Sequence, residues 1–281
     1  MELSRTTLQG LSEVIQRVCG LALGPEKAYL VRHRLAPVVQ REGLASFEQL
    51  LDRLNGRNPG RLQDVIIEAI TTKETSFFRD HACFAALESA VLPECGRVLQ
   101  EMPRQRHRIR FWSAGCATGQ EAYSLAMLVR EAGSANLREA ACTILATDLS
   151  AAALEYAQAG CYTASEVKRG VSEARLALHF TRAGSHWTVA EPLRRLIHFR
   201  RFDLLRSIAS LGAFDMILCR NVLIYFDEPT RQRVCKGLCD VLQEGGWLVL
   251  GAAESLPTPH PRVETVTLGR VRLYRKRQRC G

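Results

Sequence analysis

The chain has 281 residues, 47% of them hydrophobic and 24% charged, which is typical of a globular protein with one large domain or two unequal ones. This composition excludes an intrinsically disordered chain, and no apolar run reaches the roughly 18 residues that a membrane-spanning helix needs. The N-terminus lacks the basic-then-apolar pattern of a signal peptide, so we expect a cytoplasmic protein without direct membrane insertion. The formal net charge of +9 permits an anionic partner, whether nucleic acid, acidic lipid or acidic protein, without choosing among them.

Ten cysteines are spread through a chain that is too long to be a small disulfide-rich domain. No Cys-x-x-Cys pair occurs, and Cys235 and Cys239 have no histidine nearby that would complete a metal site. We therefore expect reduced thiols and no metal cofactor.

The first part of the chain, residues 8–70, has apolar residues at helical spacing, such as Leu11, Val14 and Val18. Glycines interrupt this pattern at intervals, which predicts a small all-α unit of about four helices. The expected start signals of these helices are Ser12, Pro25 and Ser46.

From about residue 108 short apolar runs alternate with helix-length segments. The alternation predicts a doubly wound parallel sheet with crossover helices. The expected strands are 109–113, 142–146, 214–219 and 246–251, and the expected helices are 120–133, 151–158 and 229–242.

Two stretches depart from this alternation. Residues 161–200 contain helical material and then two apolar runs, 186–190 and 195–199, which we interpret as a hairpin grafted onto the sheet. At the C-terminus, runs 262–266 and 270–274 flank Gly269, so the sheet is expected to end in an antiparallel pair.

The turn after the first strand carries Gly115 and Gly119 before a helix that opens with Gln120 and Glu121. Glycines let the backbone approach a ligand, and the free N–H groups of the helix start favour its polar groups. The turn is neither G-x-G-x-x-G nor a GK[ST] loop, so a ligand without a pyrophosphate is favoured over a dinucleotide or triphosphate. A plain tight turn is the alternative interpretation.

Asp148 ends the second strand, where a carboxylate can accept both ribose hydroxyls of an adenosine. Alternatively, it caps the helix that begins near Ala151. Arg220, Asn221 and Tyr225 follow the strand 214–219 at the ligand-binding edge of such a sheet. This segment has neither the Asn/Asp-Pro-Pro-Tyr/Phe motif nor the Pro-Cys nucleophile of nucleic-acid methyltransferases, which argues against base methylation.

Segment 71–80, between the helical unit and the sheet, contains hydroxyls, an aromatic pair and Arg79. It suits either a linker that folds over a ligand or a capped helix start. Together with residues 112–124, 146–148, 160–162 and 219–226, it resembles the chemotaxis receptor methyltransferase (CheR) family, and the resemblance runs nearly end to end.

The resemblance implies a class I S-adenosylmethionine-dependent methyltransferase fold. This is a Rossmann-like doubly wound α/β sheet with an antiparallel terminal hairpin. A small all-α domain, residues 1–72, would precede the methyltransferase domain, residues 73–281. A small β-subdomain would be inserted at about 161–200.

The resemblance also implies the site residues. Lys73, Thr75 and Arg79 would contact the donor beside the Gly115 turn. Glu121 would take its ammonium group and Asp148 its ribose. The residues flanking the adenine would be Asp203 and Leu204, those at the methionine end Arg220 and Asn221, and those nearest the transferred methyl Arg79 and Tyr225.

By the same resemblance, the reaction is methyl esterification of receptor glutamates, with S-adenosylhomocysteine as product and no covalent enzyme intermediate. The partner would be the cytoplasmic domain of a chemoreceptor, facing Arg32, Arg34 and Arg41 of a monomer, with no nucleic acid involved. The short link 180–187 predicts action independent of a receptor C-terminal pentapeptide. The alternatives are a same-fold methyltransferase of another protein or a small molecule, and a donor-binding regulatory module.

Overall fold

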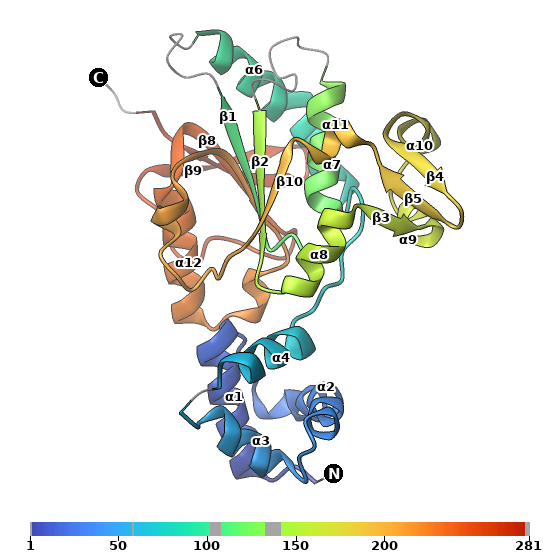
Figure 1. Ribbon diagram of the computed structural model, residues 1–281. Coiled ribbons are helices and arrows are strands. Elements are labelled where there is room, and N and C mark those ends of the chain that lie inside the picture. The colour runs from blue at the N-terminus through green and yellow to red at the C-terminus, as the bar shows by residue number, and fades with distance from the viewer. Residues whose placement is uncertain (1, 58, 102–107, 133–141, 279–281) are drawn as a thin grey trace.

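The computed structural model describes residues 2–57, 59–101, 108–132 and 142–278. The helical N-terminal unit forms its own small bundle at one end of the molecule (Figure 1). Its helices are α1 (Arg5–Cys19), the 3-10 helix η1 (Pro25–Lys27), α2 (Ala28–Arg41), α3 (Phe47–Leu54) and α4 (Gly60–Ile70).

Apolar side chains of these helices, including Leu11, Ile15, Leu35 and Phe47, are fully buried in a separate core. Ser46 caps α3 and Pro25 opens η1, as predicted. The expected start at Ser12 is wrong, because the Ser4 hydroxyl accepts the N–H of Thr7 and α1 already begins at Arg5.

The main sheet has seven strands in the order β6-β2-β1-β7-β8-β10-β9. The first five are parallel and the last two complete an antiparallel hairpin, which confirms the predicted class I fold. The strands are β1 (Ile109–Ala114), β2 (Cys142–Asp148), β6 (Ile197–Arg201), β7 (Phe214–Cys219), β8 (Leu242–Leu250), β9 (Val263–Leu268) and β10 (Val271–Lys276).

Helices cover both faces of this sheet, and neighbouring residues of one strand enter different cores. Phe111 and Met216 pack on the side of α7, whereas Trp112 and Ile217 pack on the side of α12. The remaining helices are α5 (His81–Ala86), the π-helix η2 (Leu87–Val91), α6 (Leu92–Glu101), α7 (Gln120–Glu131), α8 (Ala151–Ala159), η3 (Ile208–Leu211), η4 (Leu223–Tyr225) and α12 (Glu228–Asp240).

The inserted subdomain projects from one side of the sheet (Figure 1). It contains a three-stranded sheet in the order β3-β5-β4 and three short helices. These elements are β3 (Cys161–Thr163), α9 (Ala164–Lys168), α10 (Glu173–His179), β4 (Phe180–Ala183), β5 (His186–Val189) and α11 (Glu191–Arg194).

The predicted hairpin between 186–190 and 195–199 is wrong. Strand β5 pairs with β3 and β4, whereas β6 pairs in parallel with β2 in the main sheet. The short α11 and buried Leu193 and Leu196 separate the two strands. The predicted insertion at 161–200 therefore reaches too far, since β6 already belongs to the main sheet.

Candidate active site

The carboxyl ends of β1, β2, β6 and β7 open into a cavity of about 340 Å³, which the helical domain closes from the other side. Eleven residues are predicted from the sequence to form a donor and methyl-transfer site, and all of them except Lys73 line this cavity. The ten are Thr75, Arg79, Gly115, Glu121, Asp148, Asp203, Leu204, Arg220, Asn221 and Tyr225.

The glycine turn passes tightly beneath the cavity. Gly115 and Gly119 have φ values of 77° and 95°, which side chains rarely adopt. A β-carbon on Gly115 would lie 2.4 Å from Cγ2 of Val222, so only glycine lets this turn pack against the loop after β7. The N–H groups of Gly115 and Cys116 both donate to the carbonyl of Thr147, which ties the turn to the end of β2.

Asp148 is held at the end of β2 by two backbone donors. Its carboxylate accepts the N–H of Ser150 at 2.9 Å and the N–H of Ala117 at 2.8 Å. The hydroxyl of Ser150, not Asp148, caps α8 by accepting the N–H of Ala153, so the interpretation of Asp148 as the helix cap is wrong. Burial raises the pKa of Asp148, although the N–H groups of Ser150 and Ala117 favour the ionised form.

Arg220 forms a buried ionic cluster behind the cavity, with only 2% of its side chain exposed. Its guanidinium donates to Glu121 at 3.1 Å and to the carbonyl of Arg79 at 2.7 Å, and it lies 3.5 Å from Asp80. Ser113 donates its hydroxyl to the other oxygen of Glu121. Burial by itself would lower the pKa of Arg220, but the carboxylate of Glu121 outweighs it and the pKa is raised. The guanidinium is therefore a permanent cation that fixes Glu121.

One donor of this cluster has no partner. The Nε of Arg220 is buried and makes no hydrogen bond to any described residue. A buried unpaired donor costs free energy unless a ligand or water satisfies it, so this atom marks a place where an acceptor group is expected.

The cavity wall contains strained backbone. Within the described ranges, the non-glycine residues with positive φ are Phe78, Asp80, Ala117 and Asn221. Ala117 and Asn221 line the cavity, and the other two flank Arg79. Each such conformation costs roughly 1 kcal/mol or more and persists where surrounding contacts enforce it, which is common at ligand sites.

Segment 71–80 is a linker that leads into α5, whose N-cap residue is Asp80, although no side chain caps that helix. Phe77 and Phe78 are fully buried in the main core, where Phe77 packs edge-on against Tyr162. The N–H of Phe78 donates to the hydroxyl of Ser124. These anchors leave Arg79 exposed at the cavity, where its guanidinium donates to the carbonyl of Glu74.

Glu254 supports the site, although this role was not predicted from the sequence. Its buried carboxylate accepts the N–H groups of Asn221 at 2.7 Å, Gly251 at 2.8 Å and Ile224 at 3.2 Å. These bonds hold Asn221 in its left-handed conformation and position η4, which ends in Tyr225. A signal existed, since Glu254 follows the carboxyl end of β8 as the other site residues follow β1, β2 and β7.

The helical domain also contributes to the cavity, through Cys19 and Leu21. Leu21 forms an antiparallel bridge with Phe226, and the N–H of Ala22 donates to the carbonyl of Tyr225. Nothing in the sequence pattern indicated this contact. The other lining residues outside the prediction are Thr71, Thr72, Glu74, Ala117, Leu149, Phe202, Val222, Ile224 and Phe226.

Lys73 lies beside the cavity but does not line it. Its ammonium pairs with the Glu68 carboxylate at 2.5 Å and also donates to the Glu68 carbonyl. Over the part of the chain that the structure describes, no group of three or more His, Cys, Asp and Glu side chains is arranged to hold a metal ion. No described helix is both long and apolar enough to cross a membrane.

The fold and the cavity define a class I S-adenosylmethionine-dependent methyltransferase. Residues 73–271 match the family described as "CheR methyltransferase, SAM binding domain", and residues 6–71 match "CheR methyltransferase, all-alpha domain". The chain belongs to the CheR methyltransferase family.

Among its relatives is the chemotaxis protein methyltransferase 1 of Pseudomonas aeruginosa, 40% identical over 245 residues that cover 86% of this chain and 87% of that protein. The chemotaxis protein methyltransferase Cher2 of Pseudomonas putida is 38% identical over 245 residues, with the same coverage. The chemotaxis protein methyltransferase of Vibrio anguillarum is 40% identical over 250 residues, 87% of each chain.

Proposed function

We propose that this protein methylates glutamate side chains on the cytoplasmic helices of chemoreceptors, giving γ-glutamyl methyl esters for adaptation in chemotaxis. The observation that carries the proposal is the cavity itself. It combines carboxylates suited to a cationic donor, Glu121 and Asp148, with a cation for an anionic acceptor, Arg79. The family relationship and the names of the relatives agree with this chemistry.

The residues fit S-adenosylmethionine. Glu121 would take the ammonium group, and Arg220, with its unpaired Nε, and Asn221 would hold the methionine end. Asp148 would accept the ribose hydroxyls. The residues that would flank the adenine are Asp203 and Leu204, and those that would complete the donor site are Lys73, Thr75, Arg79 and Gly115.

When bound, S-adenosylmethionine supplies a methyl group activated by a sulfonium, and S-adenosylhomocysteine leaves as product. Because opposite charges disappear as carboxylate and sulfonium react, strong hydration of the acceptor would slow the reaction. The task of Arg79 is therefore to orient the acceptor carboxylate, and that of Tyr225 is to hydrogen-bond near the reacting centre. The Tyr225 backbone is fixed on the helical domain through Ala22, so that domain helps to close the site.

The receptor would face α2 of the helical domain. Arg32 and Arg41 are exposed there and remain candidates for contacting a glutamate-rich helix. Arg34 has another role in the fold, because its guanidinium donates to the carbonyls of Ile70 and Thr71 at the end of α4. These bonds satisfy carbonyls that the helix leaves unpaired.

Further points belong to the proposal. The protein acts as a monomer in the cytoplasm, without nucleic acid, membrane insertion or a metal. The boundary between its helical domain and its methyltransferase domain lies between residues 72 and 73. It needs no receptor pentapeptide. The last point rests on the tight β4–β5 connection, which consists of Gly184 and Ser185 alone.

The test is transfer of labelled methyl from S-adenosylmethionine to purified receptor cytoplasmic domains, followed by mild base. We expect label that base releases, and equal labelling of receptors with and without a C-terminal pentapeptide. Base-stable label would exclude a glutamyl ester. Label on another protein or a small molecule in place of the receptors would support the alternative methyltransferases, and donor binding without any transfer would support a regulatory module.

The raised pKa of Asp148 predicts how donor affinity depends on pH. The ionised carboxylate accepts hydroxyl hydrogen bonds, so affinity is present above its pKa and lost as pH falls through it. Because burial raises this pKa, the loss should occur at a higher pH than for an ordinary aspartate. Calorimetric titration with S-adenosylhomocysteine at stepped pH checks this. Asp148→Asn should bind S-adenosylhomocysteine more weakly, and its affinity should change less with pH. Identical pH profiles for this variant and the unsubstituted protein would contradict the assignment.

A further inference from the structure

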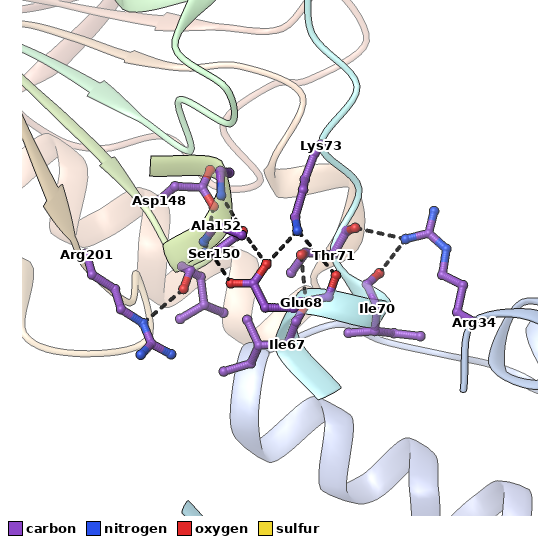
Figure 2. Close-up of polar contacts among 12 residues, drawn as sticks. Arg34, Ile67, Glu68, Ile70, Thr71, Lys73, Asp148, Ser150, Ala152 and Arg201 are labelled. Carbon is purple, nitrogen blue, oxygen red and sulfur yellow. Dashed lines mark hydrogen bonds and ion pairs between the residues drawn. The ribbon is translucent and has the colours of Figure 1, made fainter. Parts of the chain in front are cut away.

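Glu68, on α4 of the helical domain, reaches across to the methyltransferase domain (Figure 2). One carboxylate oxygen accepts the Ser150 hydroxyl at 2.6 Å and pairs with the Lys73 ammonium at 2.5 Å. The other accepts the N–H of Ala152 at 3.2 Å. A single side chain thus joins the linker to the start of α8.

The partners of Glu68 lead directly to the donor site. Ser150 caps α8, and its own N–H donates to the carboxylate of Asp148 at 2.9 Å. Asp148 in turn accepts the N–H of Ala117 in the glycine turn. Glu68 therefore holds the residue that positions Asp148, although it does not itself line the cavity.

The helix that carries Glu68 is itself fixed at its end. Arg34 of α2 donates to the carbonyls of Ile70 and Thr71 (Figure 2). It also donates to the hydroxyl of Thr72, and both threonines line the cavity. The position of α2 and α4 is thereby linked to two sides of the site, the linker and the Asp148 turn.

The chemistry of Glu68 supports a specific role. The carboxylate is part-buried, and burial would raise its pKa, but bonds from Lys73, Ser150 and Ala152 outweigh this and lower it. Each of the three donors to Glu68 belongs to the facing domain or to the linker. Hydrogen bonds to an ionised carboxylate are stronger than those between neutral groups. A nearby acidic residue of the same helix, Asp64, pairs with Arg201 at the surface, where each side chain is about half exposed. Such exposed pairs contribute little.

We propose that Glu68 is a positioning residue for donor binding: it holds Ser150, and through Ser150 the ribose-binding carboxylate of Asp148, from the helical domain. The proposal rests on the proposed donor site. It adds that the helical domain sets donor affinity as well as facing the acceptor.

The experiment measures S-adenosylhomocysteine binding by calorimetry, without any acceptor protein. Glu68→Ala should weaken binding roughly tenfold, as expected for the loss of a charge-assisted hydrogen bond. Glu68→Gln, which keeps an acceptor for Ser150, should recover most of the affinity. Asp64→Ala is the matched control on the same helix and interface, and should stay within about twofold of the unchanged protein.

A double-mutant cycle with Ser150→Ala separates positioning from general loosening of the interface. If Glu68 acts through Ser150, Glu68→Ala should cost little further affinity in the Ser150→Ala background. Additive losses, or equal losses in Asp64→Ala and Glu68→Ala, would overturn the proposal, as would unchanged affinity in Glu68→Ala. If the unsubstituted protein binds no S-adenosylhomocysteine, the donor site itself fails, which is a different outcome.

Discussion

Replacement of Arg220 by alanine is expected to lower both the free energy of unfolding and the affinity for the donor. The guanidinium is buried between Glu121, Asp80 and the carbonyl of Arg79. Its loss leaves Glu121, which is only 12% exposed, without its cation. Breaking a buried pair in this way costs about 3 kcal/mol or more. Since the same cation orders Glu121, donor affinity should fall by roughly a hundredfold.

Urea denaturation and calorimetry measure the two effects of Arg220→Ala separately. Arg220→Lys keeps the charge, but the lysine cannot reach all three partners at once. Its stability and donor affinity should therefore lie between those of the unsubstituted protein and those of Arg220→Ala. The double variant Arg220→Met with Glu121→Gln should be more stable than Arg220→Ala, because the buried position 121 then carries no unpaired charge. Unchanged stability and affinity in Arg220→Ala would show that the cluster does not organise the site.

Substitution of the two residues assigned to the methyl-transfer step should slow turnover. Arg79→Ala removes the cation that orients the acceptor carboxylate, and we expect a loss of roughly a hundredfold in kcat/KM. Tyr225→Phe removes one hydroxyl and should reduce kcat about tenfold, with donor affinity nearly unchanged. Single-turnover methyl transfer together with calorimetry separates the chemical step from donor binding.

Tyr156→Phe is the matched control for the tyrosine, because its hydroxyl bonds to Glu166 and it does not line the cavity. That variant should transfer methyl groups at the normal rate. If Arg79→Ala and Tyr225→Phe both kept normal turnover with unchanged donor affinity, the assignment of these two residues would be wrong.

Local patterns were sufficient for much of the methyltransferase fold. Alternating strands and helices predicted the parallel sheet, and the run around Gly269 predicted its closing hairpin, because period and turn chemistry are local properties. Gly115, Asp148 and Arg220 each follow a strand directly. The carboxyl ends of parallel strands meet at one edge, so their convergence in one cavity could be expected.

Contacts between distant segments could not be predicted in this way. Residues 186–189 and 197–201 pair with different sheets, and each pairing depends on which strand lies next to it in the folded chain. Since both are short runs that contain apolar residues, their sequences do not distinguish the two partners. The sequence likewise did not indicate that Cys19 and Leu21 reach the cavity, since α1 shows only an ordinary apolar face.

The sequence by itself therefore determined the helical and α/β domains, the glycine turn, and the charged residues at the strand ends, because these depend on residue type and spacing along one segment. Only the tertiary structure decided that Glu254 supports Asn221, that Lys73 is engaged by Glu68, and that the helical domain closes the cavity. Each of these depends on a hydrogen bond or an ion pair between groups whose proximity is set by packing, not by their order in the chain.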